Sequence, residues 1–284
     1  MPKVRVRDIE MYYELKGAGR PVVLIGGLAG DARAWAPQVE VLSKTYQVLA
    51  FDNRGTGRSD CPPGPYTTRL FAEDTVALMD ALSLPAAHVI GRSMGGAIAQ
   101  EVALNFPDRV RSLVITASFG KLDRYGAQIL ENIMEVVKAQ GYRAAAKHQS
   151  LFFFPPAYFN THKEELDAFE KLLGNVDRPV HAYVASTLAC IEHDALDRLD
   201  HIKCPTLVLA GQADVLCSVQ CSREIVKRVP KAELKVLKGT SHFFLVQKPE
   251  ETMGYILDFL KNVDRTRRAP AKPPKGKPAP KRRR

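Results

Sequence analysis

The sequence has few cysteines and no long hydrophobic run. Its five cysteines, an odd number scattered over 284 residues, argue against a disulfide framework and favour a reducing compartment. No apolar stretch approaches the roughly 18 residues that span a bilayer, and no hydrophobic segment follows the N-terminus as in a secretory signal. We therefore expect a cytoplasmic protein. Cys217 and Cys221 lie four residues apart without further Cys or His ligands to complete a zinc set, so we expect buried free thiols, no metal and no cofactor.

Most of the chain also has no excess of positive over negative charge. The formal net charge is +10, but residues 265–284 alone hold six Arg, four Lys and no acid. The preceding 264 residues contain 31 basic and 31 acidic residues and are neutral. Because residues 265–284 also contain five Pro and no large apolar side chain, we expect a disordered basic tail. We favour a solvated extension, the alternative being weak electrostatic contact with nucleic acid or an anionic membrane surface.

The first 119 residues and the last part of the chain alternate between strand and helix patterns. Residues 4–15 alternate as a hairpin does, and short apolar runs of the kind found in buried parallel strands follow. The expected strands are 22–25, 46–51, 88–90, 110–116, 206–210 and 233–237, and the expected helices are 33–43, 71–82, 94–105, 222–229 and 249–262. This order predicts βαβ units over a parallel sheet.

Residues 120–191 break this alternation. Helical patterns dominate there, at 129–139, 142–149, 164–173 and 180–191, and Phe152–Pro156 interrupts them. A helical block inserted into a βα series indicates an excursion over the sheet. We therefore expect a core of residues 1–119 and 192–264 and a helical cap, or lid, of residues 120–191.

Gly91–Gly95 matches the G-x-S-x-G pattern, with Ser93 at its centre. It follows an apolar strand and opens a helix of small residues, which is the context that this motif requires. The serine lies on so sharp a turn that its neighbours two positions away must lack bulky side chains, and both are glycine. We predict Ser93 as a nucleophile at a helix N-terminus, where the dipole favours developing negative charge.

A serine hydroxyl needs a base, and the base needs an orienting acid. Of the histidines after the helical block, His242 lies in the loop after the last predicted strand, where ligand chemistry collects on an open α/β sheet. Asp214 follows the preceding strand and is the carboxylate of that loop. Another acid would have to follow the strand at 110–116, where none occurs before Asp123. We predict a Ser93–His242–Asp214 triad.

A tetrahedral intermediate requires two backbone N–H donors, an oxyanion hole. Met94 follows the nucleophile and is the first candidate. The loop after the strand at 22–25 begins Gly26–Gly27–Leu28, and its glycines allow a close approach of the backbone to a substrate. We choose the Leu28 N–H as the second donor, with Gly27 as the alternative.

With these motifs the chain resembles the α/β-hydrolase superfamily over residues 1–262. The resemblance rests on Leu24–Gly27 with Trp35, on Asp52–Asp60, on the serine turn, and on the Asp214 and His242 loops. It implies an eight-stranded, mostly parallel sheet flanked by helices, with an inserted helical lid. The family usually has His-Gly where Gly26–Gly27 stands, and His or Leu where Arg92 stands. We expect the Arg92 side chain to point away from the pocket, the alternative being that it pairs with a carboxylate there.

Within the superfamily the chain is similar to three groups. Pro62–Tyr66 and Ser93–Gly96 resemble 3-oxoadipate enol-lactonases, whereas Gly26–Leu28, Leu151–Pro155 and Cys221–Glu224 resemble aminoacrylate hydrolases. The triad is shared with cofactor-free haloperoxidase-esterases. The resemblance implies a carboxylic ester hydrolase or lactonase that acts on a small ester, lactone or related acyl compound. Ser93 argues against the haloalkane dehalogenases and epoxide hydrolases, which use an aspartate nucleophile.

The expected mechanism is two-step acyl transfer through an acyl-serine. Gly27, Phe119, Phe153, Phe154, Tyr158 and Phe243 are the candidates for binding the substrate. The aromatic candidates equally fit a packed core of the cap, and we expect Trp35 to be structural. A member of another class, a slow hydrolase-fold ligand receptor or signalling protein, is the alternative function. The sequence leaves open a homodimer.

Overall fold

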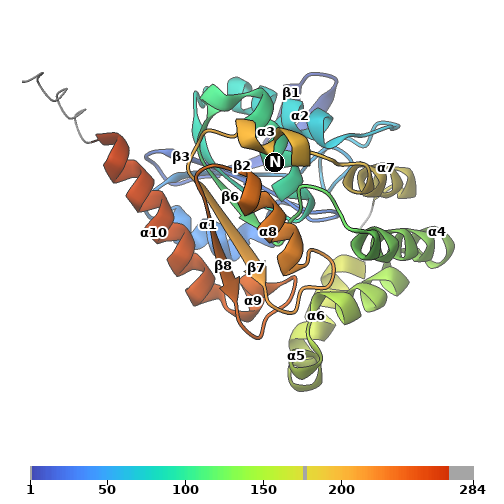
Figure 1. The fold of residues 1–284 in the computed structure, drawn as a ribbon. Helices are drawn as coiled ribbons and strands as arrows, with labels where there is room; N and C mark the ends of the chain where they lie inside the picture. The colour runs from blue at the N-terminus through green and yellow to red at the C-terminus, as the bar shows by residue number, and fades with distance from the viewer. Residues whose placement is uncertain (1, 175–177, 269–284) are drawn as a thin grey trace, which may run out of the picture.

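The computed structural model describes residues 2–174 and 178–268, in which the strands form one eight-stranded sheet (Figure 1). The strand order is β1-β2-β4-β3-β5-β6-β7-β8. The pairs β1–β2 and β2–β4 are antiparallel, and all other neighbours are parallel. The predicted, mostly parallel sheet is therefore confirmed. The strands are β1 (Lys3–Val6), β2 (Ile9–Lys16), β3 (Pro21–Ile25), β4 (Gln47–Phe51), β5 (Ala87–Arg92), β6 (Val110–Thr116), β7 (Thr206–Gly211) and β8 (Ala232–Leu237).

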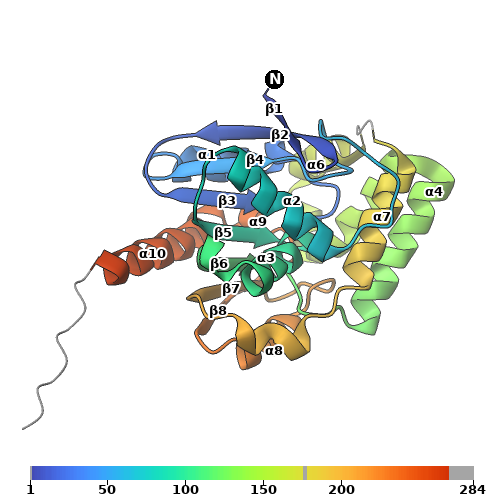
Figure 2. The same ribbon diagram turned by 90° about the horizontal axis from the view of Figure 1, so that it is seen from above.

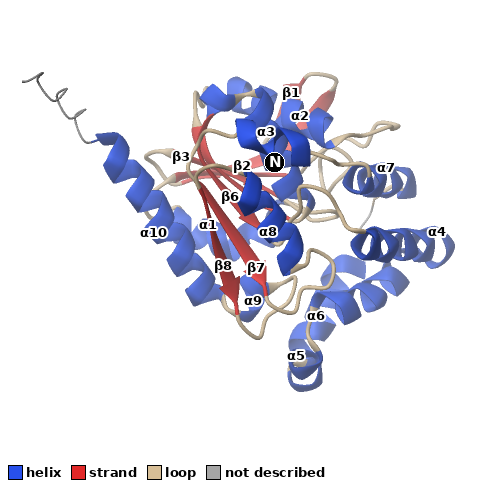
Figure 3. Cartoon of the chain, in the orientation of Figure 1, coloured by secondary structure: helices blue, strands red, loops and turns tan. Residues whose placement is uncertain are grey.

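Helices cover both faces of the sheet (Figure 3). They are η1 (Ala32–Trp35), α1 (Ala36–Leu42), α2 (Thr68–Ala81), α3 (Met94–Asn105), η2 (Pro107–Arg109), η3 (Leu196–His201), α8 (Val219–Arg228), α9 (Phe244–Gln247) and α10 (Pro249–Arg268). Side chains alternate along a strand, so Val23 and Ile25 of β3 enter the core beneath α2, α3 and α8. Val22 and Leu24 enter a second core, beneath α1 and α10. A strand that is apolar on both faces therefore lies in the middle of the sheet.

In the described part of the chain, four α-helices lie between β6 and β7 and gather on one side of the molecule (Figures 1 and 2). They are α4 (Arg124–Phe153), α5 (Pro156–Thr161), α6 (Lys163–Gly174) and α7 (Val180–Ile191). α4 packs against α6 and α7. It bends at Gly141, whose φ of 79° is not helical, and this bend separates the two helices that the sequence predicts. We use the name cap for residues 120–191.

The C-terminal helix differs from the sequence prediction. α10 continues to Arg268, four residues into the tail expected at 265–284, so disorder from residue 265 is wrong. Arg is a good helix former and is favoured at a helix C-terminus, which accounts for the extension beyond residue 264. Residues 269–284 lie outside the described part of the chain. Among the described residues, no helix is long and apolar enough to cross a membrane.

Candidate active site

Ser93 lies on a strained turn between β5 and α3. Its φ of 55° and ψ of −122° are unusual for a residue with a side chain, and such strain persists where the surroundings fix it. A Cβ on Gly91 would lie 2.1 Å from the carbonyl oxygen of Gly95, and one on Gly95 would lie 2.1 Å from that of Ile25. Both distances are far inside van der Waals contact. The glycines that the sequence motif supplies are therefore required for this turn to close.

Hydrogen bonds from two segments hold the backbone of Ser93. Its N–H donates to the carbonyl of Thr116 at the end of β6, at 2.9 Å. Its carbonyl accepts from the N–H of Gly96, at 2.8 Å, and from the hydroxyl of Ser118, at 2.7 Å. The turn is consequently fixed to the neighbouring strand as well as to its own helix.

The loops after β7 and β8 lie against each other. The N–H of Ala213 donates to the carbonyl of Thr240 at 2.8 Å, and the hydroxyl of Ser241 donates to the carbonyl of Ala213 at 3.1 Å. A Cβ on Gly211 would come within 2.2 Å of the Ser241 carbonyl oxygen. The absence of a side chain at position 211 therefore lets the Asp214 and His242 loops meet.

The structure brings the three predicted triad residues together. His242 Nε2 lies 3.1 Å from Ser93 Oγ, and His242 Nδ1 lies 2.8 Å from Asp214 Oδ2. The second oxygen of Asp214 accepts hydrogen bonds from the N–H groups of Leu216 and Cys217, both at 2.9 Å. Asp214 and His242 are almost completely buried. This geometry can pass a proton from the hydroxyl to the imidazole while the carboxylate fixes the ring orientation.

The acid and the histidine next in question, Asp123 and His193, have different surroundings. Asp123 caps α4 by accepting from the N–H of Gly126 at 2.8 Å. His193 is hydrogen bonded to Thr68 at 2.8 Å, and burial lowers its pKa to about 4. Neither of them contacts Ser93 among the described contacts. His242 and Asp214 are thus the histidine and the carboxylate that the fold places beside the predicted nucleophile.

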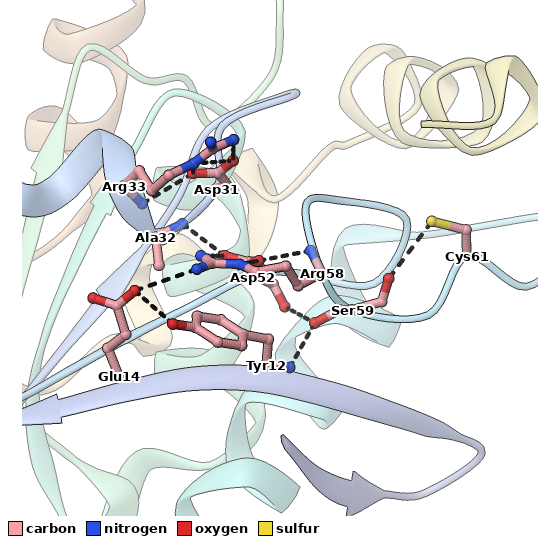
Figure 4. Close-up of polar contacts among 9 residues, drawn as sticks. All are labelled: Tyr12, Glu14, Asp31, Ala32, Arg33, Asp52, Arg58, Ser59 and Cys61. Atoms are coloured by element: carbon pink, nitrogen blue, oxygen red, sulfur yellow. Dashed lines mark hydrogen bonds and ion pairs between the residues drawn. The ribbon is translucent and has the colours of Figure 1, made fainter. Parts of the chain in front are cut away.

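The loop after β3 lies directly against Ser93. A Cβ on Gly27 would be 3.2 Å from the Cβ of Ser93. Buried Asp52 braces this loop by accepting from the N–H of Ala32 at 2.7 Å and from the Arg58 guanidinium at 2.8 Å (Figure 4). The motif around Asp52 therefore supports the loop that carries Leu28 and Gly27. The donor roles predicted for Leu28 and Met94 remain predictions.

A cavity lies over Ser93, between the sheet and the cap. Its described lining comprises Gly27, Leu28, Arg92, Ser93, Phe119, Leu122, Leu130, Gln149, Phe153, Cys190, Leu216, His242 and Phe243. The volume is about 40 Å³, enough for a few water molecules or a small acyl group. Four of the predicted substrate-binding residues, Gly27, Phe119, Phe153 and Phe243, are in this lining.

Two predicted substrate-binding residues are not in the described lining. The ring of Phe154 packs against Phe243, with ring centroids 5.6 Å apart. Tyr158 stacks on Phe154 at 5.3 Å and hydrogen bonds to Glu165. Phe153 ends α4, and Phe154 follows it in an extended conformation with φ −123° and ψ 140°, so the two side chains leave the backbone in different directions. Phe154 contacts the lining residue Phe243, and Tyr158 contacts Phe154.

Arg92, which we expected to point away from the pocket, belongs to the described lining of the cavity and is 7% exposed. Its guanidinium carbon lies 5.0 Å from the ring centre of Phe243 and 5.5 Å from that of Trp35. Burial lowers the pKa of the guanidinium to about 10. No ion pair links it to a carboxylate among residues 2–174 and 178–268.

Sequence reasoning missed most of the cap's contribution to the cavity. Leu122, Leu130, Gln149 and Cys190 come from the start of the cap, from both arms of α4, and from α7. Three of them are small or apolar residues of the kind found in any core, and Gln149 lies at an ordinary helical position, so no local pattern distinguishes these four. Only the docking of the cap onto the sheet reveals them.

One group of possible metal ligands adjoins the site. Ligand atoms of Asp214, Cys217 and His242 lie within 4.8 Å of one another, and no other such group occurs in the described ranges. Asp214 and His242 already hydrogen bond to each other. Burial raises the pKa of the Cys217 thiol, which disfavours the thiolate that binds metals. We therefore interpret the group as part of the serine site.

A larger, open hollow of about 830 Å³ lies elsewhere, between the β3 and β4 amino ends and α10. Its lining includes Arg20, Tyr46 and Asp264, and no serine, cysteine or histidine among the described residues. Ligands of open α/β sheets bind at the carboxyl ends of the strands, which is where Ser93, Asp214 and His242 lie.

Comparison with known proteins agrees with this fold. The sequence profile described as alpha/beta hydrolase fold matches residues 20–249. The chain is 34% identical to the candidate carbamate hydrolase RutD of Caulobacter segnis, over 88% of this chain and 96% of that protein. It is 31% identical to the protein of the same name in Azorhizobium caulinodans, over 93% of this chain and all of that protein. The crystal structure of the enol-lactonase from Burkholderia xenovorans superposes with a TM-score of 0.85 at 26% identity, over 92% of this chain and all of that one. The chain therefore belongs to the α/β-hydrolase fold family.

Proposed function

We propose that the protein is a serine hydrolase that cleaves a small acyl substrate through an acyl-serine intermediate. The observation that supports this most strongly is the continuous hydrogen-bond chain from Asp214 through His242 to Ser93 Oγ, with distances of 2.8 and 3.1 Å. This series of hydrogen bonds ends at Ser93, in the lining of a cavity at the carboxyl edge of the sheet. A serine aligned with an oriented base is the arrangement that nucleophilic catalysis requires.

In the first step, Ser93 Oγ attacks the carbonyl carbon while His242 Nε2 accepts the hydroxyl proton. Asp214 accepts from His242 Nδ1, which keeps the ring in the tautomer that can act as a base. The carbonyl oxygen becomes an oxyanion, for which we propose the N–H groups of Leu28 and Met94 as donors, with Gly27 as the alternative to Leu28. His242 then returns the proton to the leaving group, and the acyl group remains on Ser93.

In the second step, water attacks the acyl-serine and His242 accepts a proton from it. The oxyanion forms again, and its collapse releases the acid and restores the Ser93 hydroxyl. Phe153 stacks on the His242 ring, with centroids 4.9 Å apart and planes at 29°. This contact supports a fixed ring position through both proton transfers.

The cavity favours a small substrate. A volume of about 40 Å³ leaves no room for a long acyl chain. Relatives named as candidate carbamate hydrolases and as an enol-lactonase lie at 26–34% identity, with nearly their full length covered. We therefore propose a small ester, lactone or carbamate as the substrate, and a carboxylic ester or lactone bond as the first to test.

The test is a burst assay with p-nitrophenyl acetate and butyrate and a small lactone, on wild type and Ser93→Ala. We expect turnover in the wild type and its loss in Ser93→Ala by about 10⁴-fold or more, because the nucleophile is removed. Ser43→Ala, at the end of α1 and far from the triad in the fold, is the matched control and retains turnover.

A fluorophosphonate reagent provides a second readout. It should label the wild type and Ser43→Ala on Ser93, and leave Ser93→Ala unlabelled, as intact-mass and peptide mass spectrometry would show. Neither turnover nor labelling in a folded wild type would contradict the proposal. That outcome would favour the alternative of a ligand receptor.

A further inference from the structure

Arg92 places a positive charge beside the cavity that holds the nucleophile. It precedes Ser93 in the chain, lines the same cavity and is 7% exposed. Its pKa of about 10 keeps the guanidinium protonated at neutral pH. In the described lining it is the one permanently charged side chain, and no acidic residue accompanies it.

A buried arginine needs partners for its charge. Arg54 pairs with Asp74 at 2.5 Å and with Asp8 at 2.8 Å, whereas Arg178, 7% exposed like Arg92, donates to the carbonyl of Ala29 at 2.8 Å. Such partners compensate the cost of removing a charge from water. Arg92 has no such partner among the described residues and faces the rings of Trp35 and Phe243 instead. Aromatic rings compensate a cation only in part, because their quadrupole attraction is weaker than that of a full negative charge.

We propose that the Arg92 guanidinium binds a carboxylate group of the substrate, so that the site takes small esters or lactones that carry a carboxylate. The proposal deepens the proposed function and rests on it. The planar guanidinium matches a carboxylate by two parallel hydrogen bonds. A single cation in a small, mostly apolar lining suits a monoanion better than a phosphate dianion.

Arg92 is adjacent to Ser93 in the chain, so a group bound to its guanidinium has a defined position relative to the nucleophile. Arg92 ends β5 and Ser93 follows it on the strained turn, so the hydrogen bonds that hold Ser93 also fix the backbone of Arg92. A carboxylate held there orients the ester carbonyl relative to Ser93 Oγ. Binding energy at the anionic end is thereby used to position the bond that breaks.

The test compares two esters of matched shape, monomethyl succinate and methyl succinamate. They differ in carrying a carboxylate or a neutral amide at the far end. We expect the wild type to favour the anionic ester in kcat/KM, and Arg92→Gln to lower the ratio of the two kcat/KM values by about 10- to 100-fold, the range for hydrogen bonds to a charged group. The ratio cancels any general damage to the site.

Two further variants separate charge and geometry. Arg92→Lys keeps the charge without the planar fork and should retain an intermediate ratio. Arg69→Gln removes an exposed arginine of α2 that pairs with Glu73 at 3.1 Å, and should keep the wild-type ratio. If Arg92→Gln also keeps the wild-type ratio while esters are hydrolysed, Arg92 only packs between the rings. The proposal is then wrong and the hydrolase function stands.

A binding experiment makes the two failures distinguishable. Isothermal titration of Ser93→Ala with propionate and propionamide requires no turnover. We expect propionate to bind Ser93→Ala at least 10-fold more tightly than propionamide does, and Arg92→Gln with Ser93→Ala to lose that preference. If the wild type hydrolyses no ester, the proposed function fails, and the propionate preference alone decides the role of Arg92. Equal affinities for propionate and propionamide would overturn it.

Discussion

The sheet and the cap contribute to the cavity in different ways. The sheet supplies Ser93, Asp214 and His242 from loops whose backbones are hydrogen bonded to neighbouring loops and strands. The cap supplies side chains such as Leu130 and Phe153, which project from helices. The three residues of the proposed triad, whose distances must be kept within narrow limits, thus lie on loops that backbone hydrogen bonds hold in place. The shape of the cavity depends on how the side chains of the cap pack.

The two regions also differ in how well their apolar residues are covered. The middle strands of the sheet are buried almost completely on both faces. In the cap, Tyr125 and Leu151 are each 62% exposed and Leu172 is 48% exposed. Fewer buried contacts mean a lower free energy of local opening. We therefore expect the cap to tolerate substitutions that the sheet loops do not, and the predictions below test this comparison.

The largest loss of activity should follow a substitution that keeps the shape of Asp214 and removes its negative charge. In Asp214→Asn, one amide oxygen can still accept from Leu216 and Cys217, so the fold should persist. The amide can no longer hold His242 in the basic tautomer, and we expect kcat to fall by about 10⁴-fold. Steady-state kinetics and a thermal melt measure the two quantities.

Asp194→Asn is the matched control for this change. Asp194 also accepts from a backbone N–H, that of Leu196, and pairs with Lys121 at the surface. It should keep the wild-type kcat. A kcat in Asp214→Asn within 10-fold of the wild type would remove Asp214 from the proposed triad.

A second prediction compares one glycine of each region. Gly95→Ala would force a Cβ to within 2.1 Å of the Ile25 carbonyl oxygen, so the turn at Ser93 cannot close. We expect a loss of more than about 4 kcal/mol in the free energy of unfolding. Gly141→Ala in the cap meets no atom within 4 Å, and its φ of 79° costs only about 1–2 kcal/mol.

Urea unfolding of both variants and the wild type measures this difference. Gly254→Ala in α10 also meets nothing within 4 Å and has no positive φ, so it should stabilise the helix by about 0.5–1 kcal/mol. Equal destabilisation by Gly95→Ala and Gly141→Ala would show that the cap is as tightly constrained as the sheet.

The smallest effect concerns the shape of the cavity. Phe153→Ala removes a cap ring from the lining and from its stack on His242. We expect the ratio of kcat/KM for p-nitrophenyl hexanoate over acetate to rise by about 3- to 10-fold, since added volume accommodates further methylenes. Phe169→Ala is the control, because it removes a ring that packs edge-on against Phe153, with ring centroids 6.2 Å apart, and that is not in the described lining. An equal rise in both variants would mean that the cap loosens as a whole.

Local patterns in the sequence were sufficient to predict the sheet and to select Ser93, Asp214 and His242, which the structure brings together. The serine turn needs glycines at fixed distances, and buried parallel strands need apolar runs, so both leave a trace within a few residues. Asp214 and His242 were found because loops after successive strands meet at one edge of the sheet. These predictions depend on the order of elements along the chain, which the sequence states directly.

The tertiary structure alone decided three features of the cavity: the surroundings of Arg92, the absence of Phe154 and Tyr158 from the described lining, and the presence of four cap residues in it. Arg92 is adjacent to Ser93 in the sequence, but the sequence does not reveal that its guanidinium lies near the rings of Trp35 and Phe243. Which side of a cap helix faces Ser93 depends on how that helix docks. The sequence by itself determined which residues lie at the strand ends beside Ser93, because their placement follows from local backbone geometry and the order of the elements. The tertiary structure determined the shape and charge of the cavity, because these arise from side chains that meet only after the cap has packed onto the sheet.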